Sequence, residues 1–169
     1  MRHLLEAHKG HLVALIVSAI LGITQFSRLI PAKTKSEELL LYLALCGVCG
    51  IAVLFLLALL MRNFGRWFGS EAELYRVRTA LGFGVLPWTI LFTVLSFLLN
   101  YGLDPNLVAK QYFPIVLGAF VYGFCVLLLS LTAGLRLGII KTFLCIVITI
   151  SFCVVPLTFL VQYLVNFLE

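Results

Sequence analysis

Cysteines and histidines are the residues whose spacing could support metal or redox chemistry. Cys46 and Cys49 form a C-x-x-C pair, which in a soluble chain is typical of zinc or thiol sites. No second pair and no histidine lies nearby, and all five cysteines fall inside apolar runs, which indicates small apolar residues at helix interfaces. His3, His8 and His11 share the N-terminal stretch, but a zinc site needs further ligands. The sequence therefore predicts no metal site and no cofactor.

The carboxylates do not form a pair suited to acid–base catalysis. The Asp and Glu residues flank apolar runs, and the chemistry of a helix start explains Glu71 and Glu73. The sequence contains no nucleophile elbow, no H-E-x-x-H motif and no P-loop. We therefore expect a protein that is not an enzyme.

Composition then indicates the environment in which these residues must be held. Of the 169 residues, 63% are hydrophobic and 11% are charged, whereas soluble domains carry about 25% charged residues. A soluble protein could not cover so much apolar surface, so the remainder must face lipid or protein. The net charge of +5 comes from residues at the ends of apolar segments, which is typical of membrane flanks and not of a nucleic-acid partner.

Five apolar segments are each close to the ~20 residues that a helix needs to cross the hydrocarbon core. They cover residues 12–30, 39–61, 79–101, 113–133 and 139–168. Helices are expected because lipid offers no partner for a free backbone N–H or C=O. The predicted fold is all-α, a polytopic integral membrane bundle of five transmembrane helices in one domain, 1–169. The spans after the first contain no Asp, Glu, Lys, Arg or His in their hydrocarbon stretches, which argues against a proton relay or a charge-coupled pump.

Proline and glycine predict kinks in the third and fifth helices. Pro87 removes one backbone hydrogen bond from the third span, where Gly82 and Gly84 also allow a neighbour to approach closely. Pro156 lies midway along the fifth. These kinks could serve packing alone, or an unwound segment could expose carbonyl groups to a cavity.

The loop from Arg62 to Arg78 is the polar region with the strongest local signals. Ser70 and Glu73 match a capping box, which predicts a helix start at Ser70. Basic and aromatic residues concentrate here, and those we predict to bind a partner are Arg62, Arg66, Trp67, Arg76 and Arg78. Further on, Gly134 and Gly138 are expected to be turn residues between the last two spans.

The Lys/Arg distribution predicts orientation. Eight lie on the side of the N-terminus and of the second and fourth loops: Arg2, Lys9, Arg62, Arg66, Arg76, Arg78, Arg136 and Lys141. Four lie on the other side: Arg28, Lys33, Lys35 and Lys110. By the positive-inside rule the N-terminus is cytoplasmic and the C-terminus is outside. We expect a bacterial inner membrane, with the endoplasmic reticulum or Golgi membrane as the alternative.

Residues 69–88, GSEAELYRVRTALGFGVLPW, resemble the Yip1 family of membrane proteins, in which a polar start leads into a helix with a y-s-l-l-P type signature. The run LSLTAGLRLG at 129–138, followed by Lys141, looks like that family's turn between the last two spans. The resemblance implies five spans with a cytoplasmic N-terminus. The long N-terminal region and the D-L-Y-G-P-type motif of eukaryotic members have no counterpart here, so the chain looks more like the short prokaryotic members. Only fold and topology are carried over.

Two functions fit these features. One is a non-enzymatic membrane scaffold or adaptor that contacts a protein partner through the cytoplasmic loop. The alternative is a small transporter, channel or lipid-handling protein for uncharged or amphipathic cargo, with its site beside the kinks. Membrane lipids are partners in either case, and a homo-oligomer is expected if five helices do not suffice.

Overall fold

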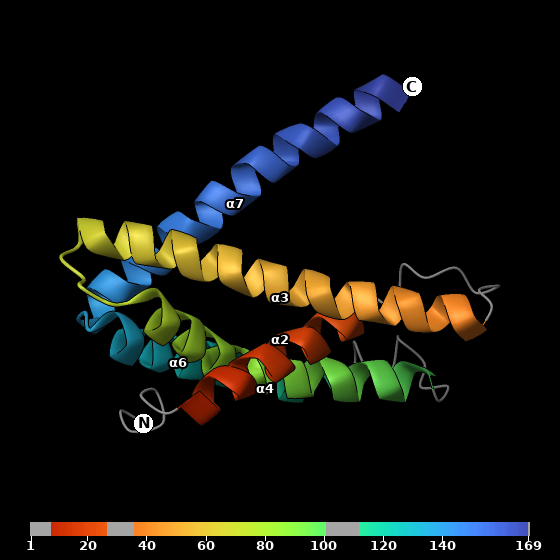
Figure 1. Ribbon diagram of the computed structural model, residues 1–169, viewed down its shortest axis with the longest axis horizontal. Helices are drawn as coiled ribbons and strands as arrows, with labels where there is room; N and C mark the ends of the chain where they lie inside the picture. The colour runs from red at the N-terminus through yellow and green to blue at the C-terminus, as the bar shows by residue number, and fades with distance from the viewer. Residues whose placement is uncertain (1–7, 27–35, 101–111, 169) are drawn as a thin grey trace.

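The computed structural model describes residues 8–26, 36–100 and 112–168, and within them every regular element is a helix (Figure 1). The all-α prediction is therefore confirmed. The helices are α2 (His8–Phe26), α3 (Ser36–Trp67), α4 (Leu74–Asn100), α6 (Phe113–Leu135) and α7 (Ile139–Leu168).

Four of the described helices are long and apolar enough to cross a membrane. The candidate spans are Glu38–Trp67, Leu74–Leu98, Phe113–Leu135 and Ile139–Pro156, and α2 contributes a shorter apolar stretch, Gly10–Phe26. Large apolar side chains lie on the outside: Leu40 is 74% exposed, Ile115 69% and Ile140 77%. Since water would penalise such a surface, the chain is a multi-pass integral membrane protein.

The structure differs from the predicted spans mainly in the first three segments. α2 ends at Phe26, and the last residues of the predicted 12–30 span lie outside the described residues. α3 continues six residues beyond the predicted end at Met61, because hydropathy marks where an apolar run ends and arginine is still a good helix former. α4 begins at Leu74, five residues before the predicted span 79–101 and four residues after the helix start predicted at Ser70.

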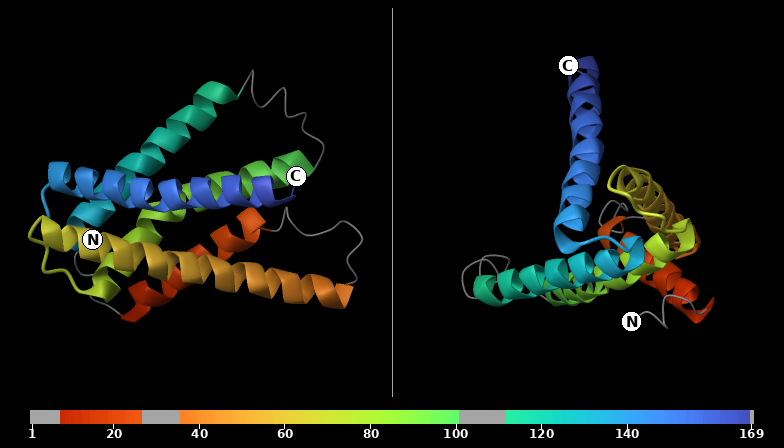
Figure 2. Two further views of the ribbon diagram at one scale, coloured as in Figure 1. Left: turned by 90° about the horizontal axis from the view of Figure 1, so that it is seen from above. Right: turned by 90° about the vertical axis from the view of Figure 1, so that its left-hand side faces the viewer.

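The helices pack in the order α3, α2, α4 and α6, with α2 touching both α3 and α4, and α4 packing along α6. The last helix behaves differently. α7 crosses the C-terminal part of α3, where the Cys145 thiol donates to the Met61 carbonyl at 3.5 Å and the rings of Phe64 and Phe152 lie 5.6 Å apart. Beyond this crossing α7 leaves the other four helices (Figures 1 and 2).

Glycines permit the close helix crossings. A Cβ built on Gly22 of α2 would lie 2.7 Å from the Gly50 Cα of α3, so the two backbones touch with no room for a side chain. On α4, Gly82 faces Ala14 of α2, and a Cβ on Gly84 would lie 2.9 Å from the Leu127 Cα of α6. Small residues at such contacts are the usual means of bringing membrane helices together.

Both predicted kink prolines lie inside continuous helices. Pro87 is within α4 and Pro156 is within α7, and neither helix is interrupted. Thr89, two residues after Pro87, donates its hydroxyl to the Val85 carbonyl at 3.1 Å. The Val85 carbonyl therefore has a side-chain donor, whereas Pro87 has no N–H to offer the Phe83 carbonyl, and the bends themselves stay a prediction.

Candidate functional site

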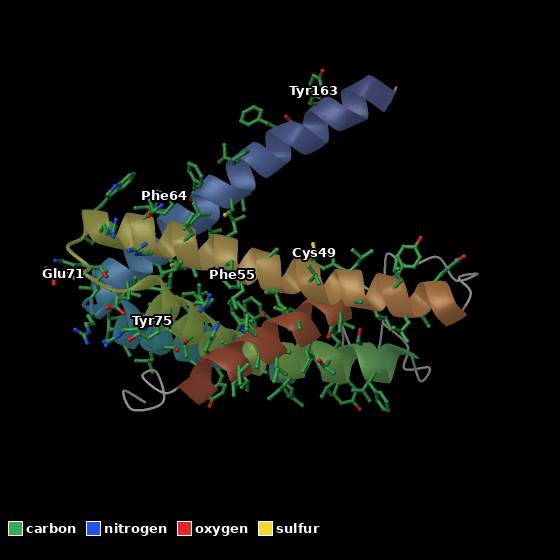
Figure 3. The ribbon with its side chains drawn as sticks, viewed as in Figure 1. Cys49, Phe55, Phe64, Glu71, Tyr75 and Tyr163 are labelled. Carbon is green, nitrogen blue, oxygen red and sulfur yellow. The ribbon has the colours of Figure 1, made fainter. Side chains whose placement is uncertain are left out.

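Every Lys and Arg whose side chain the structure describes lies at one end of the bundle. This end is formed by the C-terminal parts of α3 and α6 and the N-terminal parts of α4 and α7 (Figure 1). We call the following set the basic end: Arg62, Arg66, Arg76, Arg78, Arg136 and Lys141. Figure 3 shows nitrogen atoms gathered here, around the labelled Glu71 and Tyr75. The loop between α3 and α4 carries two carboxylates, Glu71 and Glu73. They are fewer than the basic side chains, so this end is positively charged.

A tight turn joins α3 to the loop that leads to α4. The N–H groups of Phe68 and Ser70 both donate to the Gly65 carbonyl at 3.0 Å, and the Gly69 N–H donates to the Arg66 carbonyl at 3.0 Å. Gly69 has a φ of 88°, in the left-handed region that favours glycine. The last carbonyl groups of α3 are thus satisfied inside the turn.

Ser70 ties this turn to α6. Its hydroxyl donates to the Leu135 carbonyl at 2.6 Å and accepts from the Ala72 N–H at 3.2 Å. The predicted capping box is therefore wrong. α4 begins at Leu74, and the Glu73 carbonyl accepts the first helical N–H groups, while the Ser70 hydroxyl accepts from the Ala72 N–H in the loop before the helix.

The connection between α6 and α7 also differs from prediction. Gly134 is not a turn residue: it lies inside α6, buried, with Ala80 of α4 directly against it. The left-handed residue that ends α6 is Arg136, at φ 55° and ψ 34°. Lys141, in the first turn of α7, donates its ammonium to the Phe68 carbonyl at 3.4 Å, which connects α7 to the α3–α4 turn.

Arg78 and Arg62 are part of the packing between helices. The Arg78 guanidinium lies 4.4 Å from the centre of the Phe55 ring of α3 and 3.0 Å from the His11 imidazole of α2. The Nε atoms of Arg62 and Arg78 are buried and have no hydrogen-bond partner among the described residues. These two arginines therefore belong to the inner side of the basic end.

The outer side of the basic end consists of side chains that face away from the bundle. Arg66, Arg136 and Lys141 are exposed, and Trp67 is 75% exposed with its ring edge-on to Phe64 at 5.1 Å. Arg76 donates from Nε to its neighbour Tyr75 at 3.0 Å.

The structure thus divides the five residues predicted to bind a partner. Arg66 and Trp67 are exposed, whereas Arg62, Arg76 and Arg78 are half-buried, and of these three Arg76 is the one whose guanidinium contacts its neighbour Tyr75. Sequence reasoning did not assign Arg136 and Lys141 to this site, although both belong to the basic side of the orientation count. No sequence signal predicted the Ser70–Leu135 or His11–Arg78 contacts, because each joins residues more than sixty positions apart.

The second predicted group does not form part of this site. Gly82 and Gly84 lie at helix crossings, Pro87 lies further along α4, and Pro156 lies on the part of α7 that leaves the bundle. Within the described part of the chain, no three His, Cys, Asp or Glu side chains gather as metal ligands would. Four basic residues of the predicted opposite side, Arg28, Lys33, Lys35 and Lys110, lie outside the described residues.

Comparison with known proteins gives no relative. No family model matches the chain, and neither a curated protein nor a solved structure matches it. The resemblance to the Yip1 family therefore stays a prediction from residues 69–88 and 129–138.

Proposed function

We propose that this chain is a non-enzymatic membrane scaffold or adaptor of the Yip1 type, and that the outer side of its basic end contacts a protein partner. The observation that carries the proposal is the gathering of six basic side chains, the basic end, at one end of the bundle. Large side chains that are exposed elsewhere on the described helices are mostly apolar.

The contact surface is held in shape by the contacts beneath it. Ser70 is bound to the Leu135 carbonyl and Lys141 to the Phe68 carbonyl, so three helices fix the position of the exposed loop. A surface that is ordered before binding loses less conformational freedom when a partner docks. The mixture of exposed Arg66, Trp67 and Tyr75 is typical of protein contacts, which are rich in arginine and aromatic residues.

The packing of α4 favours a scaffold over the alternative of a transporter, channel or lipid-handling protein. Ala14 packs against Gly82 and Leu127 packs against Gly84, so neither glycine faces open space. α4 continues as a helix on both sides of Pro87. A cargo site of the predicted kind would need an unwound segment at this point, whereas Pro87 removes a single hydrogen bond from a continuous helix.

For topology we propose five spans, with the N-terminus cytoplasmic and the C-terminus outside. The charge count supports this orientation. The inner membrane of a bacterium is the proposed location, and the endoplasmic reticulum or Golgi membrane is the alternative.

Site-specific photo-crosslinking in native membranes tests the scaffold function. A photoreactive residue at Glu71, in the exposed loop, is expected to give a discrete adduct with another protein, and Arg66→Gln with Arg76→Gln is expected to reduce its yield several-fold. The same residue at Ile90, which is 57% exposed on the apolar surface of α4, is the control and should give no such adduct. Equal protein adducts at both positions, or none at Glu71, would contradict the proposal.

A further inference from the structure

Arg66 and Arg136 lie directly after the two residues that form one contact between α3 and α6. A Cβ built on Gly65 would lie 3.0 Å from the Leu135 Cδ2, so these two residues touch. Each is followed in sequence by an arginine, Arg66 and Arg136, and both arginines are exposed. Neither makes a side-chain hydrogen bond or an ion pair within the described residues. Two guanidinium groups therefore start from neighbouring backbone positions with their donors unused.

The backbone from which these arginines project is fixed by several hydrogen bonds. Ser70 joins the turn both to the Gly65 carbonyl and to the Leu135 carbonyl, and Lys141 reaches the Phe68 carbonyl from α7. Three cationic side chains, those of Arg66, Arg136 and Lys141, are thereby brought to one turn from three different helix ends. Guanidinium groups bind phosphate oxygens with paired, charge-assisted hydrogen bonds.

The position of this turn relative to the membrane indicates that the phosphate belongs to a lipid headgroup. The apolar spans of α3, α6 and α7 all begin or end here, so the turn lies at the level of the lipid headgroups. Trp67 stands beside it, 75% exposed, and tryptophan is enriched at the boundary between headgroups and hydrocarbon. Glu71 and Glu73 share this end, but the basic side chains outnumber them.

We propose that Arg66 and Arg136, assisted by Lys141, bind the phosphate of an anionic membrane lipid, and that Trp67 lies against its glycerol and upper acyl region. The lipid is bound at the outer edge of the basic end. This inference goes beyond the scaffold function and does not require it, because a chain without any protein partner would still retain the lipid.

Native mass spectrometry of the detergent-solubilised chain tests the proposal, with phosphatidylglycerol or phosphatidylcholine added as the probe. The chain is expected to bind phosphatidylglycerol more tightly than phosphatidylcholine. Arg66→Gln and Arg136→Gln should each weaken phosphatidylglycerol binding about tenfold, because each removes charge-assisted hydrogen bonds to the phosphate. Binding of phosphatidylcholine should not change.

Arg76→Gln is the matched control, because it removes the same charge from the same end at a residue that contacts Tyr75. It should weaken binding less than twofold. An equal loss in all three variants would overturn the proposal, since it would reveal a general attraction to positive charge. Competition by soluble glycerol phosphate at equal concentration would also overturn it, because the site would then be one for free phosphate. Thermal unfolding of each variant in detergent shows whether the fold is retained. Arg66→Lys keeps the charge but not the paired donors, so its loss of phosphatidylglycerol binding should lie between those of the parent and of Arg66→Gln.

Discussion

The Nη2 atom of Arg78 on α4 lies 3.0 Å from the Nε2 atom of His11 on α2. A guanidinium group can only donate, so Nε2 must be the acceptor and His11 must be neutral in this arrangement. The contact connects the start of α2 to the first turn of α4, and the Phe55 ring of α3 covers the same guanidinium at 4.4 Å. One arginine therefore links three helices.

Replacing His11 tests this link. His11→Lys should destabilise the bundle by about 1–2 kcal/mol, because it replaces an acceptor for a charged donor with a second cation. His11→Gln should lose less, since its amide oxygen can still accept. Thermal unfolding in detergent measures both, and a His11→Lys variant that is as stable as the parent would show that the contact does not contribute.

The glycine at the crossing of α2 and α4 gives a second prediction. Gly82→Ala should destabilise the fold by about 1–3 kcal/mol, because its Cβ would collide with Ala14. The matched control is Gly118→Ala on α6, where a Cβ would meet nothing within 4 Å and helix propensity favours alanine. The two variants should shift the unfolding midpoint in opposite directions or by clearly different amounts. Equal shifts would contradict the observed crossing.

Ser70→Ala should cost about 1–2 kcal/mol, because it leaves the buried Leu135 carbonyl without the hydroxyl donor that lies 2.6 Å away. Ser151→Ala, at an exposed position of α7, is the control and should change stability by less than about 0.5 kcal/mol. Chemical unfolding in mixed micelles compares the two. If Ser70→Ala resembled Ser151→Ala, the connection between the α3–α4 turn and α6 would be unimportant for stability.

Thiol accessibility tests the topology. In a chain whose five native cysteines are replaced by alanine, Glu38→Cys lies near the start of α3 and Glu71→Cys lies in the exposed loop after its end. A membrane-impermeant maleimide applied to intact cells should label Glu38→Cys and spare Glu71→Cys until the membrane is opened. The reverse pattern would invert the proposed orientation, and labelling of both in intact cells would show that α3 does not span.

Sequence reasoning predicted the helices well where apolar runs decide them. The predicted spans 113–133 and 139–168 nearly coincide with α6 and α7, because lipid requires long continuous helices. It failed where a contact distant in sequence decides the local structure. Ser70 resembles a helix cap by its neighbours, but α4 begins four residues later, and Ser70 lies in a loop where its hydroxyl binds the distant Leu135 carbonyl. Gly134 resembles a turn residue, but it lies inside α6, where Ala80 of α4 leaves no room for a side chain.

The same contrast between local patterns and distant contacts explains why the site was predictable only in part. Clustering of charge along the chain identified Arg66 and Trp67, which are exposed in the structure, and Arg76, which is half-buried. The division into inner and outer arginines depends on the relative positions of α2, α3 and α4, and no local pattern encodes those positions. Arg78 illustrates this, because its surroundings come from His11 and Phe55 and not from its own loop.

The departure of α7 from its neighbours has a mechanical consequence. α7 has 30 residues, a rod of roughly 45 Å, and its described aromatic and thiol contacts come from Phe143, Cys145 and Phe152 in its first half. Its base is the short connection that contains the left-handed Arg136. Because these contacts hold the first half of α7, a bend of about ten degrees just beyond Phe152 would sweep the last part of the helix, roughly 24 Å long, through about 4 Å at its tip while the four other helices stay in place. The chain thus has the geometry of a lever whose fulcrum lies at the contact between Phe64 and Phe152.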